Sequence, residues 1–302
     1  MNFKSIRFGF LPESETNGVR VTLEPRLRPF EVVNVLRLVN GPCGDWREKV
    51  RADFQPAVAP HRGFRAIFTG AYSASCGECG WNVALLGHQA YVEGLFRQLW
   101  EELGGGWTGA ARDGAVPADA RLLHAHESET LGEIVRDMNK FSNNVMARQL
   151  FLTLGVESAG APARLDAAFK AVRGWLARKG LDFPELIIEN GSGLSRIDRI
   201  SAQNLLALLT AAFHSAAMPE FVASLPLVAV DGTMRRRLKG ESVAGQAHIK
   251  TGTLADARAI AGYVLAASGR RYAIVMLVNS PNAADSQQAM DALLRWVYEG
   301  AR

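Results

Sequence analysis

The sequence has no long hydrophobic run, few cysteines and few lysines. No apolar run approaches the roughly 18 residues that a membrane-spanning helix requires, and residues 1–10 interleave charged and polar side chains with aromatic ones. We therefore expect neither a transmembrane segment nor a signal peptide within these residues. The 34 basic and 30 acidic residues leave a net charge of +4, too even to indicate a nucleic-acid-binding protein. Only seven basic residues are lysine, so a lysine within a motif is expected to be needed for its compact ammonium group.

The 302 residues are 48% hydrophobic with a mean hydropathy of 0.00, which is typical of a globular protein with two domains. Near the start, apolar stretches at 19–23, 30–39 and 64–68 are broken by Pro, Gly and Asn, a pattern typical of strands and turns. A helical period then runs over 92–103 and ends at Gly104. We expect a β-rich domain over residues 1–85 and a second domain over residues 86–302.

The second part of the chain alternates helices with strands, which predicts the fold class α/β (α+β). Thr130 and Glu133 are spaced as a capping box ahead of one helix, and Ser201 is placed to cap another. Further helices are expected at about 142–154, closed by Gly155, and from residue 165 to a stop at Gly180, with a short strand at 185–189.

The last sixty or so residues predict a sheet and a closing helix. The expected strands are 247–254, 258–267 and 272–278, followed by a helix at about 283–298. Residues 274–278 are apolar at every position, which indicates a strand covered on both faces by helices.

Three cysteines, Cys43, Cys76 and Cys79, allow more than one interpretation. Cys76 and Cys79 form a C-x-x-C pair, but no βαβ unit follows it as in a thioredoxin-like redox protein. Zinc would need about four ligands, which the cysteines could supply together with His61 or His88. The simpler interpretation is one disulfide, Cys43 with Cys76 or with Cys79, which stabilises the β-rich part in an oxidising compartment.

Lys250-Thr251-Gly252-Thr253 lies inside an expected strand, where a glycine normally weakens pairing. The composition gives about 0.02 chance occurrences of K-T-G, so chance explains the motif poorly. The glycine lets another chain lie close to the strand, while Lys250 and Thr251 offer a cation and a hydroxyl to a carboxylate. An edge strand protected by a lysine is the structural alternative.

Two serine-containing segments are candidates for a reactive site. The segment 190–194 fails the G-x-S-x-G pattern of a nucleophilic serine, so we interpret it as a glycine-rich turn. Ser142-Asn143-Asn144 separates two expected helices, a place where a hydroxyl and an amide can face one cleft.

Ser142-Asn143-Asn144, followed 108 residues later by Lys250-Thr251-Gly252, resembles the second and third motifs of the penicillin-recognising serine enzymes. The surroundings resemble the class C penicillin-binding proteins, the penicillin-binding protein 4 family of D-alanyl-D-alanine carboxypeptidase/endopeptidases. The segments that carry this resemblance are 40–46, 75–78, 128–144, 189–196, 231–233 and 248–253. The resemblance implies a penicillin-recognising serine transferase-like fold, an antiparallel sheet covered by helices. It also implies that residues 1–85 are the C-terminal part of an inserted β-rich domain.

One motif of that family does not occur in the chain. The family acylates the serine of S-x-x-K, and none of the 16 serines here has a lysine three residues later. In the family this motif lies near the mature N-terminus, ahead of the inserted segment. The resemblance therefore implies a C-terminal portion that is without the nucleophile segment and the signal peptide, and that is inactive as given because the nucleophile is absent.

By resemblance, Ser142 would relay a proton to the leaving D-alanine amine, and Asn144 would hold the substrate's amide. Lys250 would supply positive potential, while Thr251 and Thr253, on either side of Gly252, would bind the terminal carboxylate. Of the two possible disulfides, we take Cys43 with Cys76 as the candidate, with Cys79 still open as the partner. No metal or other cofactor is implied.

The resemblance implies a serine-type D-Ala-D-Ala carboxypeptidase/endopeptidase of the periplasm. It would act on peptidoglycan stem peptides through an acyl-enzyme and would bind β-lactams. Two alternatives from other classes stay open. One is a non-catalytic module that binds peptide or peptidoglycan in the same cleft, and the other is a zinc or redox protein built on the three cysteines.

Overall fold

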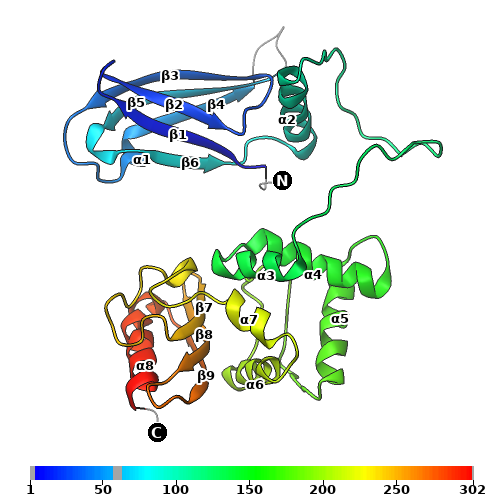
Figure 1. The fold of residues 1–302 in the computed structure, drawn as a ribbon, viewed down its shortest axis with the longest axis vertical. Coiled ribbons are helices and arrows are strands. Elements are labelled where there is room, and N and C mark those ends of the chain that lie inside the picture. The colour runs from blue at the N-terminus through cyan, green and yellow to red at the C-terminus, as the bar shows by residue number, and fades with distance from the viewer. Residues whose placement is uncertain (1–3, 57–62, 301–302) are drawn as a thin grey trace. The chain divides into compact units, whose positions relative to one another are not determined.

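The computed structural model describes residues 4–56 and 63–300, which belong to two compact units divided between Leu123 and His124 (Figure 1). This division lies later than the boundary expected near residue 85. The reason is helix α2 (His88–Glu102), which packs on the β-rich unit. Its Tyr91 is 1% exposed within that unit's core, and Arg28 N donates to Gly94 O at 3.0 Å. Gly104, with φ of 86°, ends the helix in the left-handed conformation, as predicted.

The first unit contains two three-stranded sheets. In one, with the order β2-β1-β6, all pairs are antiparallel; its strands are β1 (Ile6–Glu13), β2 (Gly18–Glu24) and β6 (Cys79–Val83). In the other, with the order β3-β5-β4, β3 and β5 are parallel; its strands are β3 (Phe30–Val39), β4 (Val50–Pro56) and β5 (Phe64–Ser73). The short helix α1 (Trp46–Lys49) precedes β4, and a 3-10 turn, η1 (Ala74–Cys76), follows β5.

Aromatic side chains from both sheets form the core of the first unit. Phe8 and Phe10 alternate along β1 and are fully buried, as is Phe68 of β5. The rings of Phe8 and Phe10 lie edge-on to Phe68, with centroids 4.9 and 5.1 Å away. The strand pattern read from the sequence is therefore correct here, including the stretch 30–39.

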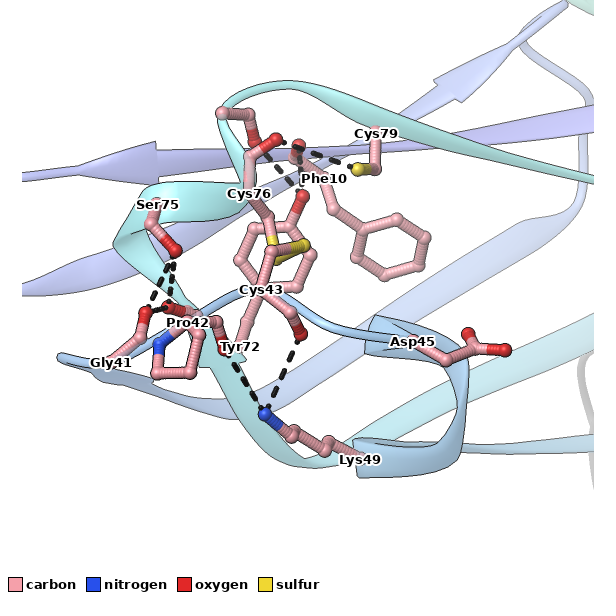
Figure 2. The surroundings of a disulfide bond; sticks show 12 residues. Phe10, Gly41, Pro42, Cys43, Asp45, Lys49, Tyr72, Ser75, Cys76 and Cys79 are labelled. Carbon is pink, nitrogen blue, oxygen red and sulfur yellow. Dashed lines mark hydrogen bonds between the residues drawn. A yellow bond between two sulfur atoms is a disulfide. The ribbon is translucent and has the colours of Figure 1, made fainter.

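A disulfide joins Cys43 to Cys76 across 33 residues at one end of this core (Figure 2). The segment around it is held by hydrogen bonds, since Ser75 Oγ donates to Gly41 O at 2.7 Å and Tyr72 Oη donates to Gly77 O at 2.9 Å. Cys79 carries a free thiol. Sulfur atoms in a disulfide are not thiolate ligands, which removes two of the cysteines considered for zinc.

The helices that precede the sheet of the second unit are α3 (Leu131–Lys140), α4 (Asn144–Ala159), α5 (Leu165–Arg178), α6 (Ala202–Phe213) and α7 (Met218–Ser224), followed by a 3-10 turn, η2 (Gly232–Met234). The capping box of Thr130 and Glu133 is confirmed, and Ser201 caps α6.

Two expectations for this part of the chain, one for a helix and one for a strand, were wrong. Helix α4 does not end at Gly155, because that glycine lies inside the helix against α5, where a Cβ would meet Ala168 N at 2.9 Å. Residues 185–189 form no strand; Ile187 makes a single bridge to Arg199.

The antiparallel sheet of the second unit has the order β7-β8-β9. Its strands are β7 (Ala247–Thr253), β8 (Ala257–Leu265) and β9 (Arg271–Asn279), and the 3-10 turn η3 (Ala283–Ser286) leads into α8 (Gln287–Gly300). Successive residues of β9 pack on opposite sides, Ile274 in the cluster with Leu294 of α8 and Val275 in the cluster with Leu209 of α6. Helices therefore cover both faces of β9, as predicted. Of the described helices, none has the length and apolar character needed to cross a membrane.

Candidate active site

A cleft of about 600 Å³ in the second unit gathers the site residues expected from the sequence. Its walls come from the α3–α4 turn, the segment around residue 193, η2, β7, β8 and the start of α8. All six expected residues line it: Ser142, Asn144, Lys250, Thr251, Gly252 and Thr253.

The end of α3 gives Ser142 its position. Asn143 N donates back to Met138 O at 2.9 Å, the closing bond of a Schellman turn, and Ser142 occupies the left-handed position with φ of 51°. Glycine is the usual residue there because other side chains are strained in that conformation. A serine that occupies this position is consistent with a need for its hydroxyl.

Asn144 begins α4 and joins it to the segment around residue 192. Its Nδ2 donates to Ser192 O at 2.6 Å. Gly191, with φ of 72°, brings this segment so close that a Cβ would lie 2.4 Å from Phe151 Cβ. The segment 190–194 is a glycine-rich turn as interpreted, and the structure also places residues 192–194 in the cleft wall.

Lys250 brings its ammonium group from β7 to the hydroxyl of Ser142. Lys250 Nζ donates to Ser142 Oγ at 2.6 Å and to Thr251 O at 2.9 Å. Burial holds the pKa of Lys250 below its ordinary value, because the charged form is poorly solvated there. A lysine in this state exchanges a proton with its neighbour more readily than a lysine in water.

The described lining of the cleft is cationic and contains no carboxylate. Besides Lys250 it includes Arg237 and Arg258, neither of which the sequence predicts as a site residue, since the basic run 235–239 is typical of a solvated turn or strand face. Arg237 Nε donates to Oδ1 of Asp291 at 2.5 Å, and Asp291 does not line the cleft. Arg258 Nη1 donates to Leu254 O and, at 3.0 Å, to Ala257 O. An anionic ligand would therefore meet attractive potential.

No group of three or more His, Cys, Asp or Glu side chains is placed to hold a metal ion in the part of the chain that the structure describes. His61, considered above as a zinc ligand, lies outside the described residues.

A family model described as the D-Ala-D-Ala carboxypeptidase 3 (S13) family matches residues 51–299, most of the chain. The chain belongs to this family. Two relatives match the chain over part of their own length. The D-alanyl-D-alanine carboxypeptidase of Actinomadura sp. (strain R39) is 36% identical over 189 residues, which make up 60% of this chain and 34% of that protein. The carboxypeptidase DacB of Haemophilus influenzae is 24% identical over 279 residues, 90% of this chain and 58% of that protein. The S13 chain thus spans about a third to three fifths of the length of these relatives.

A solved structure is similar over nearly the whole S13 chain. Penicillin-binding protein 4 of Haemophilus influenzae, crystallised with a β-lactam, has a TM-score of 0.69 at 21% identity, covering 98% of this chain and 69% of that one. At this identity the likeness establishes the fold, which is the penicillin-recognising fold expected from the motifs.

Proposed function

We propose that this S13 chain is the substrate-binding and proton-relay part of a serine-type D-Ala-D-Ala carboxypeptidase/endopeptidase. Its substrates would be peptidoglycan stem peptides, and β-lactams would bind in the same cleft. One observation carries the proposal: Lys250 Nζ lies 2.6 Å from Ser142 Oγ, in a cleft whose described lining offers cations and hydroxyls but no carboxylate.

The outer edge of β7 suits an extended peptide. Near its start this edge is occupied, because Ile249 N donates to Pro226 O at 2.7 Å. From Lys250 onward it has no strand partner among the described residues, and it lines the cleft. A stem peptide would add there as a further strand, with its terminal carboxylate between the hydroxyls of Thr251 and Thr253.

Proton transfer in the proposed reaction uses the Lys250–Ser142 pair. Ser142 would pass a proton to the amine of the leaving D-alanine, with Lys250 beside it supplying positive potential. Asn144 would hold the substrate's amide, and a backbone N–H near Thr253 would donate to the oxyanion. The attacking serine is not among these residues, since no S-x-x-K occurs in them. We therefore infer that the 302 residues alone bind substrate and are not acylated.

We further propose that the first unit is part of the family's inserted domain and that the protein works in the periplasm. The β-rich architecture of that unit supports the first proposal. Its Cys43–Cys76 disulfide supports the second, because disulfides persist in oxidising compartments.

A fluorescent penicillin tests the function directly. Binding to the 302-residue chain should raise the fluorescence anisotropy of the probe, and a peptide ending in D-Ala-D-Ala should compete and lower the anisotropy again. Because the chain is not expected to be acylated, no labelled band should appear on a denaturing gel. Fusing the S-x-x-K segment of a family member ahead of the chain should produce such a band. Lys250→Met should abolish both responses, whereas Lys239→Met, an exposed lysine that does not line the cleft, should leave them unchanged.

Two outcomes would contradict the proposal in different ways. A covalent band from the 302-residue chain would identify one of its own serines as the nucleophile. Peptide binding without any labelling of the fused protein would identify a non-catalytic binding module.

A further inference from the structure

Thr233 lies in the cleft wall, and the roles proposed above do not use it. Its Oγ1 is 3.2 Å from the Oγ1 of Thr251, a hydrogen bond in which either oxygen can be the donor. The next residue, Met234, is fully buried in the core beneath β7 and α8, so η2 is fixed in place with Thr233 exposed at the cleft.

The chemistry of two hydroxyls decides the direction of this bond when an anion is bound. A threonine hydroxyl has one proton to donate and two lone pairs to accept with, whereas a carboxylate can only accept. If Thr251 donates its proton to a carboxylate, the bond with Thr233 must run the other way, from Thr233 to Thr251. A hydroxyl that accepts such a bond is also a better donor, because hydrogen bonds in a chain polarise one another.

We propose that Thr233 is a positioning residue that sets the Thr251 hydroxyl to donate to a substrate carboxylate. The inference rests on the proposed function and deepens it, since it makes Thr233 a determinant of selectivity for a free carboxylate terminus. Within the described part of the chain, Thr251 Oγ1 has no other hydrogen-bond partner, so Thr233 alone holds its orientation.

The segment that carries Thr233 is fixed to the end of α3, two residues before Ser142. Lys140 Nζ donates to Asp231 Oδ2 and to Leu225 O, both at 2.7 Å, and its side chain is only 11% exposed. Asp231 Oδ1 in turn accepts from Leu227 N at 2.7 Å. Gly232 lies against the backbone of Lys140, since a Cβ would come within 2.5 Å of its carbonyl oxygen. One segment thus connects the element that carries Ser142 with the strand that carries Thr251.

Calorimetric titration of the 302-residue chain with an N-acylated peptide ending in D-Ala-D-Ala, and with its C-terminal carboxamide, tests the inference. The wild-type chain should prefer the free acid. Thr233→Val should weaken binding of the acid about five- to tenfold and change binding of the carboxamide less than about twofold, since a hydrogen bond to a charged group is the stronger one. Thr233→Ser should restore the preference. Thr210→Val, which removes an exposed hydroxyl bonded to Leu206 O on α6, is the matched control.

The outcomes separate this inference from the function beneath it. A wild-type chain with no preference for the acid would overturn the proposed function and the inference together. A Thr233→Val chain that keeps the wild-type preference would overturn the inference alone. If Thr233→Val weakens binding of the acid and of the carboxamide equally, or if Thr233→Ser does not restore the preference for the acid, Thr233 has a purely structural role. Either result would also overturn the inference.

Discussion

The two units are stabilised by different kinds of contact. The first unit buries aromatic rings from two sheets against one another and closes one end with a disulfide. In the second unit, an apolar core under β7 and α8 supports a cleft whose walls are joined by polar contacts between segments far apart in the sequence. Ser142 meets Lys250 across 108 residues, and Lys140 meets Asp231 across 91.

The difference follows from the physics of each contact. Apolar burial is proportional to area and has little directionality, so it gives stability without fixing one side chain to a fraction of an ångström. Hydrogen bonds between charged and polar groups have defined lengths and angles, so they set positions. Both units use the first kind for their cores, and the cleft of the second unit adds the second kind between its walls.

The largest expected effect removes the covalent link of the first unit. The double variant Cys43→Ser, Cys76→Ser should lower the free energy of unfolding of that unit by about 3–4 kcal/mol, because it releases a loop of 33 residues in the unfolded chain. Hydrogen–deuterium exchange resolved by peptide should show faster exchange in β1 and β5, with β7–β9 unchanged.

Cys79→Ser is the matched control, because it removes the free thiol and keeps the disulfide. Its exchange should equal that of the wild type. Faster exchange in β7–β9 of the double variant would contradict the separation of the two units.

A smaller effect is expected from tightening one contact at the cleft. Gly232→Ala combines a left-handed backbone, φ 54°, with a Cβ 2.5 Å from Lys140 O, and neither can relax through a side-chain rotation. Gly240→Ala has a similar φ of 77° and nothing within 4 Å. We expect Gly232→Ala to cost about 2–3 kcal/mol of unfolding free energy and Gly240→Ala about 1 kcal/mol. Urea unfolding measures both, and equal losses would show that the contact with Lys140 is unimportant.

The sequence predicts the local structure well because local signals decide it. The capping box at Thr130, the helix end at Gly104 and the alternating packing of β9 all follow from residues within a few positions of one another. Gly155 is the instructive error: a glycine that permits close helix packing and a glycine that ends a helix look alike until the neighbouring helix is known.

The site is predictable where a motif carries it. Ser142, Asn144 and Lys250 were found by motif and context, and the structure brings them to one cleft. The sequence does not predict that Arg237, Arg258 and Thr233 line the cleft, because their place there depends on tertiary contacts. Thr233 lies in segment 231–233, which contributes to the family resemblance, but the resemblance assigns no function to this residue.

The smallest expected effect is the pH dependence of stability that Lys250 contributes from the cleft. Burial lowers the pKa of Lys250 in the folded protein, so the unfolded chain binds more protons between that lowered value and the ordinary value of 10.5. The free energy of unfolding should therefore rise with pH in that window, whereas at lower pH Lys250 is charged in both states and contributes a constant penalty with no pH dependence. Compared with Lys250→Met, in which residue 250 has no titratable group, the wild type should gain stability as the pH approaches 10.5.

Urea unfolding at pH 7 and at pH 10 gives the difference in unfolding free energy between the wild type and Lys250→Met at each pH. Lys170→Met, on the exposed surface of α5, is the control for losing one lysine. A wild type that loses stability relative to Lys250→Met over this range would mean that the hydrogen bond to Ser142 favours the charged amine more than burial opposes it. The cleft would then hold a fixed cation, and Ser142 would have no partner with which to exchange a proton.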